Sequence, residues 1–596
     1  MDNTKTWDVI VVRDVMAPMR DGVHLATDLY FPAENRRPLE QKLPAVLQRT
    51  PYNKSSYEGM ADFFAKHGYL SAVQDCRGRY KSEGEFLPNI KESEDGYDAV
   101  EWLAKDPSCN GKVGTYGCSY MAWVQFKMAT QNPPSLVTMI PYQAGINQYH
   151  DASRRGGALN LGGLQWWLQQ AISSTEAQQN PVIAQAVQTM EQNFLQWAYR
   201  LPWRRDQTPL NAAPQYEDVA FQSYFENVDY SDFWRQPGFA TGDYLESYPN
   251  IPTLWVTGWY DQYFYRATTI NSYQEMVKTN KENQYLMVGP WTHNNFDSTI
   301  GDVNFGSGGG NIKSYDDYMK LELHWFNHWM KDDFSVDVGK AVKVFVMGGG
   351  DGKRHENGHL NHGGTWHSYD TWPPKGVQTK EFYLNQDGTL SQDKPDQGRS
   401  STTYTYDPRN PVSSNHGHFS LGPRDQIELP TLPGMGVPGM PIASRPDVLV
   451  FQTPPLSEDV KIMGNMKAVL WISSDAPDTD FFVKLIDVYP SSPDYPTGYA
   501  FPVSEGILRV RYRDSWEFPT LMESGKLYQI EIPVEPAANL FKANHRIRLD
   551  ICSSNFPNFD INRNTGDPNG RECRIAENTV YHEAEHASCI VLPIYP

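Results

Sequence analysis

The chain has 596 residues, with 52 Lys and Arg against 71 Asp and Glu, and a formal net charge of −19. This length exceeds what one hydrophobic core supports and predicts roughly two to four domains. The negative charge argues against nucleic acid and anionic membranes as partners. No uninterrupted run of about 18 apolar residues predicts a membrane-spanning helix, so we expect a soluble globular protein.

The cysteines and the first residues bear on the cellular compartment. Six cysteines are few for this length and form no C-x-x-C pair, which favours free thiols in a reducing compartment. The N-terminal segment lacks the basic start and the apolar stretch of a secretory signal, so we expect a cytoplasmic location. The oligomeric state stays open, a homo-oligomer included.

The first part of the chain alternates short apolar runs with helical patterns. The runs 43–49 and 69–75 are typical of buried strands, and 93–105 has apolar residues at helical spacing. Such alternation predicts a mostly parallel, doubly wound sheet with helices on both faces.

The alternation stops near residue 145. Residues 145–241 are rich in Gln, Ala and Trp, have helical spacing and contain no strand-like run, which predicts a helical cap insertion. Strands alternate with helices again at 252–261 and 283–293. We therefore assign residues 1–144 and 242–350 to one α/β domain.

The remaining residues, 351–596, have a different pattern. Short alternating strands are separated by Pro, Gly and Asn, which predicts an all-β sandwich or jelly roll. The expected fold class is therefore α/β, a doubly wound sheet with a helical cap, plus a C-terminal all-β domain.

Three chemically suited residues each end a strand-like run, and they come in the order Ser119, Asp261, His293. A serine hydroxyl needs a base to take its proton and an acid to orient that base. In an open α/β sheet, such groups meet at the carboxyl ends of the strands. Taken alone, Ser119 is equally well explained as a helix N-cap, and Asp261 as a turn residue. Together the three favour a catalytic triad.

The segments around these residues form a series of motifs. In chain order they are "QRTPYNK", "QDCRGRYKSEGEF", "GYDAVEWLA", "YGCSYMA", "GWYDQY", "VGPWTH" and, near the C-terminus, "FKANHRIRLDICSSNFPNFDINRNTG". The chain thereby resembles the X-Pro dipeptidyl-peptidase/cocaine esterase family of serine hydrolases, whose relatives include glutaryl-cephalosporin acylases and α-amino-acid ester hydrolases. The resemblance implies an α/β-hydrolase fold with a jelly roll. It also implies Ser119 as nucleophile, His293 as general base and Asp261 as orienting acid, with no cofactor.

The resemblance further implies an oxyanion hole formed by the Tyr52 hydroxyl and the backbone N–H of Tyr120. A phenol beyond a strand end and an amide at a helix N-terminus supply two donors for a developing oxyanion. Ala122 departs from the family pattern, which has glycine there; its extra methyl group lies where the helix packs on the sheet, and we expect local repacking without loss of the reactive serine. Cys118 is interpreted as a small buried residue and not as a rival nucleophile.

The substrate pocket is predicted from the cap and from the residues after Asp261. Trp166 and Trp167 are expected at the pocket, although adjacent residues on a helix cannot share one face, so at least one belongs to the core. Gln262, Tyr263 and Phe264 are also expected to contact substrate. They include no acid, whereas amino-ester hydrolases carry extra carboxylates near the triad aspartate. We therefore expect an uncharged, aromatic acyl group.

The segment "HENGH" at 355–359 matches the zinc-protease pattern H-E-x-x-H. That pattern requires a helix, which the internal Asn-Gly and the flanking glycines forbid, so we expect no metal. The resulting hypothesis is a serine hydrolase of the carboxylesterase or acylase type that cleaves small esters or amides through an acyl-enzyme. Two alternatives are an acyltransferase with the same triad and a non-catalytic binding protein on a hydrolase scaffold.

Overall fold

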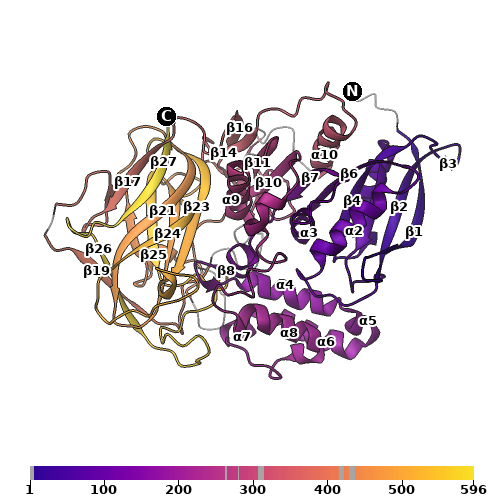
Figure 1. The fold of residues 1–596 in the computed structure, drawn as a ribbon. Coiled ribbons are helices and arrows are strands. Elements are labelled where there is room, and N and C mark those ends of the chain that lie inside the picture. The colour runs from indigo at the N-terminus through magenta and orange to yellow at the C-terminus, as the bar shows by residue number, and fades with distance from the viewer. Residues whose placement is uncertain are drawn as a thin grey trace.

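The computed structural model describes residues 6–261, 265–279, 281–306, 315–396, 398–414, 422–428 and 436–596. A central sheet with helices, a group of helices below it and a β-rich region beside it are visible in Figure 1. In these residues, no helix is long and apolar enough to span a membrane.

The central sheet has ten strands in the order β1-β2-β5-β4-β6-β7-β10-β11-β14-β16. The seven strands from β5 to β14 are parallel neighbours, and the strands at both edges are antiparallel. Every residue of β4 and β5 is buried, as expected for strands covered on both faces. The strands are β1 (Asp8–Pro18), β2 (His24–Glu34), β4 (Leu43–Thr50), β5 (Leu70–Asp75), β6 (Cys109–Cys118), β7 (Leu136–Tyr142), β10 (Thr253–Tyr260), β11 (Gln284–Thr292), β14 (Val342–Gly348) and β16 (Gly364–Tyr369), and the short β3 (Arg37–Pro38) pairs with β2.

Helices cover both faces of this sheet. The helices are α1 (Glu58–Lys66), α2 (Glu92–Ala104), α3 (Tyr120–Ala129), α9 (Tyr265–Lys278) and α10 (Tyr315–Met330). Apolar residues of α2, α3 and α9 pack into one core cluster, and those of α1 and α10 into another. Two cores on opposite faces of a parallel sheet confirm the predicted doubly wound arrangement.

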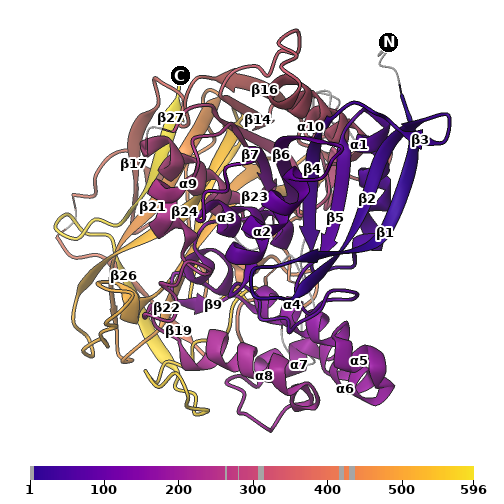
Figure 2. The same ribbon diagram turned by 45° about the vertical axis from the view of Figure 1, so that its right-hand side comes forward.

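Five helices between β7 and β10 lie together at one end of the molecule, as Figures 1 and 2 show. They are α4 (Leu161–Ile172), α5 (Thr175–Gln179), α6 (Pro181–Gln192), α7 (Phe194–Tyr199) and α8 (Pro214–Phe221), and they enclose a core of their own. We call these helices and their connections the cap. The predicted cap therefore corresponds to a separate layer of helices.

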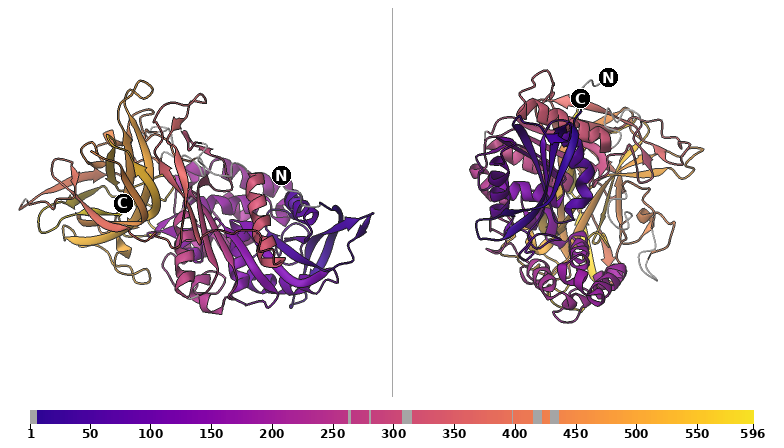
Figure 3. Two further views of the ribbon diagram at one scale, coloured as in Figure 1. Left: turned by 90° about the horizontal axis from the view of Figure 1, so that it is seen from above. Right: turned by 90° about the vertical axis from the view of Figure 1, so that its right-hand side faces the viewer.

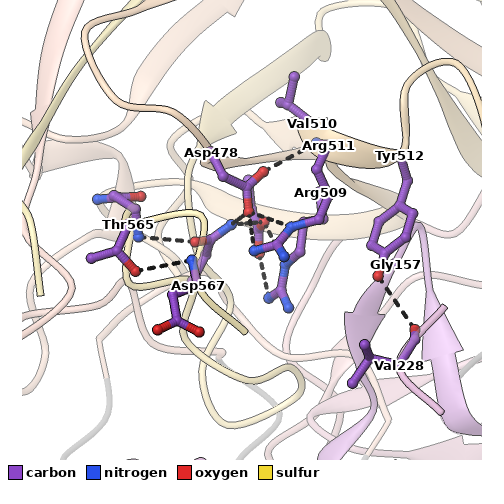
Figure 4. Close-up of polar contacts among 12 residues, drawn as sticks. Gly157, Val228, Asp478, Arg509, Val510, Arg511, Tyr512, Thr565 and Asp567 are labelled. Atoms are coloured by element: carbon purple, nitrogen blue, oxygen red, sulfur yellow. Dashed lines mark hydrogen bonds and ion pairs between the residues drawn. The ribbon is translucent and has the colours of Figure 1, made fainter. Parts of the chain in front are cut away.

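A short hairpin precedes the cap helices and was not expected from the sequence. Its strands, β8 (Arg154–Arg155) and β9 (Ala158–Leu159), have two residues each. Strands this short give no alternating pattern in the sequence. Its turn, Gly156–Gly157, has positive φ angles and touches the jelly roll: a Cβ on Gly157 would lie 2.1 Å from the Tyr512 ring. Figure 4 shows this approach, and the Tyr512 hydroxyl donates to the carbonyl oxygen of Val228 at 3.3 Å.

The C-terminal region contains two antiparallel sheets. One is built on the long β21 (Val460–Ser474), which pairs with β24 (Tyr528–Phe541), β26 (Ala576–Tyr581) and β27 (Cys589–Tyr595), with β17 (Gln378–Leu384) and β19 (Ser401–Tyr406) outside them. The other has the order β20 (Leu449–Gln452), β25 (Arg546–Cys552), β22 (Asp480–Tyr489), β23 (Tyr499–Arg509). The expected all-β C-terminal domain is confirmed.

The jelly roll and the central sheet lie side by side, as Figure 3 shows from above. They join through a short parallel pairing of β14 with β24 and through a buried ion pair of Arg266 on α9 with Glu535. The central sheet also continues through β16, past the predicted domain end at residue 350. The domain limits at 144, 241 and 350 stay predictions.

Candidate active site

Ser119 occupies a sharp turn between β6 and α3. Its φ is 60° and its ψ −124°, a left-handed conformation that side chains rarely adopt and that functional sites often retain. Gly117 allows this turn, because a Cβ there would lie 2.5 Å from the Cβ of Met121. Ser119 stands at the N-cap position of α3 but makes no side-chain capping hydrogen bond. The helix therefore does not use its hydroxyl.

Cys118 and Ala122 flank this turn, and both are buried. The Cys118 thiol donates to Oε1 of Gln143 at 3.1 Å, and burial raises its pKa well above the usual value. A thiol held protonated is a poor nucleophile. The methyl group of Ala122 is accommodated in the core beneath α3, which stays helical through this position.

Asp261 and His293 follow two neighbouring parallel strands, β10 and β11. Nδ1 of His293 lies 2.8 Å from Oδ1 of Asp261, and Oδ2 of Asp261 accepts a hydrogen bond from Thr257 at 3.1 Å. The aspartate side chain is fully buried, whereas the imidazole is 19% exposed. A carboxylate at Nδ1 selects the tautomer whose basic lone pair is on Nε2.

Ser119 and His293 both line one cavity of about 550 Å³ between the sheet and the cap. Its described walls consist mainly of aromatic rings, amide side chains, hydroxyls and glycines, with Cys118, Met121, Ala152 and the imidazole of His293, and they include no Asp, Glu, Lys or Arg. Charged ligand groups would lose water there without gaining a counter-ion. The cavity therefore suits a neutral ligand.

The two expected oxyanion donors lie at this cavity. The indole N–H of Trp166 donates to the Tyr52 hydroxyl oxygen at 3.0 Å. Tyr120 is the first residue of α3, where backbone N–H groups have no carbonyl partner within the helix. The Tyr120 ring stacks on the Trp166 ring, with ring centroids 5.7 Å apart. The Tyr120 hydroxyl donates to Oε1 of Glu92.

The other predicted pocket residues have different outcomes. Trp166 lines the cavity, but Trp167 does not. Trp167 is 2% exposed in the cap core, and its indole N–H donates to the carbonyl oxygen of Tyr216 at 2.6 Å. The expected substrate contact of Trp167 is therefore corrected to a core position. Gln262, Tyr263 and Phe264, which the sequence also placed at the substrate, lie outside the described residues.

Two cavity glutamines on α4, Gln165 and Gln169, were missed by the sequence reasoning. Their spacing of four residues, within "LQWWLQQ", places them on one helical face. Both side-chain amides donate to Oε1 of Glu191 on α6, at 3.0 and 3.3 Å. The Glu191 carboxylate therefore lies behind the cavity wall, and the amides of Gln165 and Gln169 lie between it and the cavity.

A buried lysine, also missed, lies behind another part of this wall. Nζ of Lys127 donates to Oδ1 of Asn89, which lines the cavity, and lies 5.1 Å from the Trp123 ring centroid. Burial lowers the pKa of Lys127 to about 7, against the opposing effect of Glu92. In the sequence, only the position of Lys127 among the apolar residues of α3 could have indicated that it is buried.

Residues 355–359 form a turn closed by a hydrogen bond from the backbone N–H of His355 to the carbonyl oxygen of His359. The two imidazoles therefore do not share a helix face, as H-e-x-x-H zinc binding requires. His362 nearby contacts Tyr489 and Asn539 through its two ring nitrogens.

Comparisons with known proteins give concordant results. Residues 21–295 match the family model for X-Pro dipeptidyl-peptidase (S15 family), and residues 336–591 match that for the X-Pro dipeptidyl-peptidase C-terminal non-catalytic domain. A cocaine esterase from Rhodococcus sp. is 31% identical, with 98% of each chain covered. An α-amino acid ester hydrolase structure has a TM-score of 0.76 and 26% identity, covering 100% of this chain and 98% of the other. An aminopeptidase structure from a marine sediment archaeon, Thaumarchaeota archaeon, has a TM-score of 0.78 at 24% identity with the same coverage.

Proposed function

Because the chain belongs to the X-Pro dipeptidyl-peptidase/cocaine esterase family of serine hydrolases, we propose that it hydrolyses carboxylic esters of small, uncharged acyl groups. One observation carries the proposal. The hydrogen-bonded pair of His293 and Asp261 opens on the same cavity as Ser119, a serine whose hydroxyl its helix leaves unused.

The proposed reaction proceeds through an acyl-enzyme. Nε2 of His293 takes the proton from Oγ of Ser119 as that oxygen attacks the ester carbonyl carbon, and Asp261 stabilises the imidazolium that forms. The same imidazolium then gives its proton to the leaving alcohol. A water molecule, deprotonated by His293, attacks the acyl-enzyme and releases the carboxylic acid and Ser119.

Tyr52 and Tyr120 are proposed to stabilise the tetrahedral intermediates. Their phenol O–H and backbone N–H would donate to the carbonyl oxygen as it becomes negative, which contributes about 3–4 kcal/mol per donor in comparable sites. The hydrogen bond from Trp166 supports this role, because it orients the Tyr52 hydroxyl from the cap side.

The preference for a neutral acyl group follows from the cavity walls. An ammonium or carboxylate on the acyl group would meet amides and rings, with no opposite charge in the described lining. Trp123, Trp166 and Tyr57 supply flat apolar surfaces that suit an aromatic ring.

Active-site labelling tests the proposal. A fluorophosphonate probe should modify Ser119, identified by peptide mass spectrometry, and should not modify the Ser119→Ala variant. Phenylacetyl, glutaryl and α-amino acyl esters of one phenol should then react with the phenylacetyl ester fastest. Unchanged turnover in Ser119→Ala would refute the nucleophile, and preference for either charged ester would refute the substrate class. Transfer of the acyl group to an added alcohol in place of water would favour the acyltransferase alternative.

A further inference from the structure

A second cavity, also of about 550 Å³, lies where the cap meets the jelly roll. Its cap wall runs from Trp197 on α7 to Thr208, and its jelly-roll wall comes from residues 408–409 and 561–573. None of its lining residues lines the cavity of Ser119. We call it the arginine groove, and it is separate from the proposed active site.

The arginine groove is strongly cationic. Its lining includes no Asp or Glu but five arginines, namely Arg200, Arg204, Arg409, Arg563 and Arg571. Arg409 is paired with Asp407 at 2.8 Å, whereas Arg200, Arg204 and Arg571 form no ion pair with the carboxylates of the described chain. This excess is notable in a protein with a net charge of −19. Uncompensated guanidinium groups that converge on one concave surface attract an anion.

Arg563 lines the groove and is held in place by four hydrogen bonds. One of its terminal nitrogens donates to the carbonyl oxygens of Leu201 and Tyr199, at 2.5 and 3.3 Å, and so bridges to the cap. The other donates to the carbonyl oxygen of Arg571 at 3.2 Å and to the thiol sulfur of Cys573 at 3.0 Å. None of these acceptors carries a full negative charge. The guanidinium is therefore fixed by the fold while its charge stays available to a ligand.

Aromatic rings form the other part of the groove. Trp197 and Trp203 meet edge to face, with ring centroids 6.2 Å apart, and the Trp203 indole N–H donates to the carbonyl oxygen of Trp197 at 2.9 Å. Tyr199 and Ile561 extend this apolar surface. A ligand ring can pack on these side chains while its anionic group reaches the arginines.

We propose that the arginine groove binds a small organic anion in which an aromatic ring carries a carboxylate or a phosphate. Guanidinium forks match the oxygens of both groups, and the indole and phenol rings accept the ligand's ring. Because the groove is built from cap and jelly-roll residues together, such a ligand would contact both. The proposal does not depend on hydrolysis at Ser119.

The thiol of Cys573 provides a direct test. Cys573 lines the groove and is exposed, whereas the other five cysteines are buried. N-ethylmaleimide should therefore modify Cys573 in the native protein, and the rate can be followed by mass spectrometry. Benzoate or phenyl phosphate at about ten times its Kd should slow this reaction about tenfold. Benzyl alcohol, or sodium chloride at equal ionic strength, should leave the rate unchanged.

Paired variants separate groove binding from other effects. Arg200→Gln with Arg204→Gln should abolish the protection, because it removes two exposed, unpaired charges without touching the core. The control pair Arg36→Gln with Arg37→Gln, also exposed but at the start of β3, should keep it. Ser119→Ala should also keep it, which distinguishes this outcome from failure of the proposed esterase. Protection by benzyl alcohol, protection that survives in the Arg200/Arg204 variant, or no protection by either anion would overturn the proposal.

Discussion

Two cavities of this protein have the same volume, about 550 Å³, but different electrostatic character. The described walls around Ser119 carry no charged Asp, Glu, Lys or Arg, whereas the arginine groove has five arginines and no acid. The cap contributes to both, through α4 to the first and through α7 and the following loop to the second. One helical insertion thus shapes a neutral cavity on one side and a cationic one on another.

The neutrality of the cavity of Ser119 depends on amide side chains in its wall, which lie between the cavity and nearby charges. Asn89 separates the cavity from Lys127, and Gln165 and Gln169 separate it from Glu191. In the arginine groove, the guanidinium groups form the wall themselves. We therefore expect the position of a charge relative to the wall, more than its presence nearby, to determine which ligand each cavity accepts.

The largest expected effect concerns the acid that supports His293. In Asp261→Asn the amide no longer selects the tautomer with a basic Nε2, and kcat for a phenylacetyl ester should fall by about 10⁴-fold. The fall should appear in kcat with little change in KM, measured under steady-state conditions.

Asp297→Asn is the matched control, because Asp297 is exposed and follows His293 by four residues. It should keep kcat within about twofold. Equal loss in both variants would mean that the region around His293 had been disturbed, and near-normal activity in Asp261→Asn would contradict the triad.

The next effect concerns the oxyanion donor. Tyr52→Phe removes the phenol O–H but keeps the ring, so kcat should fall by about 10²–10³-fold with KM almost unchanged. Trp166→Phe, which removes the hydrogen bond onto the Tyr52 oxygen and part of the ring that stacks on Tyr120, should lower kcat much less. Near-normal kcat in Tyr52→Phe would indicate that Tyr52 acts by packing and not by donating a proton. Equal losses in the two variants would indicate that the contact between Trp166 and Tyr52 matters more than the proton of the phenol.

These residues also mark how far the sequence alone could lead. Ser119, Asp261 and His293 each follow a run of buried strand residues, a local signal that predicts where strands end and therefore which side chains share one edge of the sheet. Tyr52 required the family resemblance, since a loop tyrosine has no periodic signal.

The arginine groove could not be predicted in this way. Arg200 and Arg571 are 371 positions apart in the sequence and meet only because the cap packs on the jelly roll. Surface arginines also fit any solvent-exposed loop, so their sequence context does not distinguish them. The Gly156–Gly157 turn and the core position of Trp167 could not be predicted for the same reason, because tertiary contacts determine both.

A third effect is the pH dependence that Lys127 confers on stability. Its pKa is about 7 in the folded chain and about 10.4 when unfolded, so between these values only the unfolded chain binds the proton, and stability rises with pH. Relative to Lys127→Met, the free energy of unfolding of the natural chain should increase by about 1.4 kcal/mol per pH unit from pH 7 to 9. Urea titrations of both proteins at pH 7 and 9 measure this difference, and parallel pH profiles would show that Lys127 is charged throughout.

A smaller effect tests whether the amides shield Glu191. Gln165→Ala removes an amide that lies on Oε1 of Glu191, and so opens the cavity toward that carboxylate. The ratio of kcat/KM for an α-amino acyl ester to that for the neutral ester should rise about fivefold, from about 1 kcal/mol of added attraction. Gln185→Ala, an exposed change on the same helix as Glu191, should leave the ratio unchanged. A fall in both rates with a constant ratio would mean that Gln165 only fills space.

The smallest effect separates the two cavities by ionic strength. Raising sodium chloride from about 20 to about 500 mM shortens the Debye length below the separation of exposed charges, so phenyl phosphate protection of Cys573 should require severalfold more ligand. KM for the neutral phenylacetyl ester should change by less than about twofold, because the cavity wall offers it no ionic contact to screen. Calorimetric titration of phenyl phosphate and steady-state kinetics across the same salt series give both numbers on one preparation. If KM rose with salt as steeply as the Kd for phenyl phosphate, charged groups would contribute to ligand binding in both cavities. The proposed difference between a neutral and a cationic cavity would then be wrong.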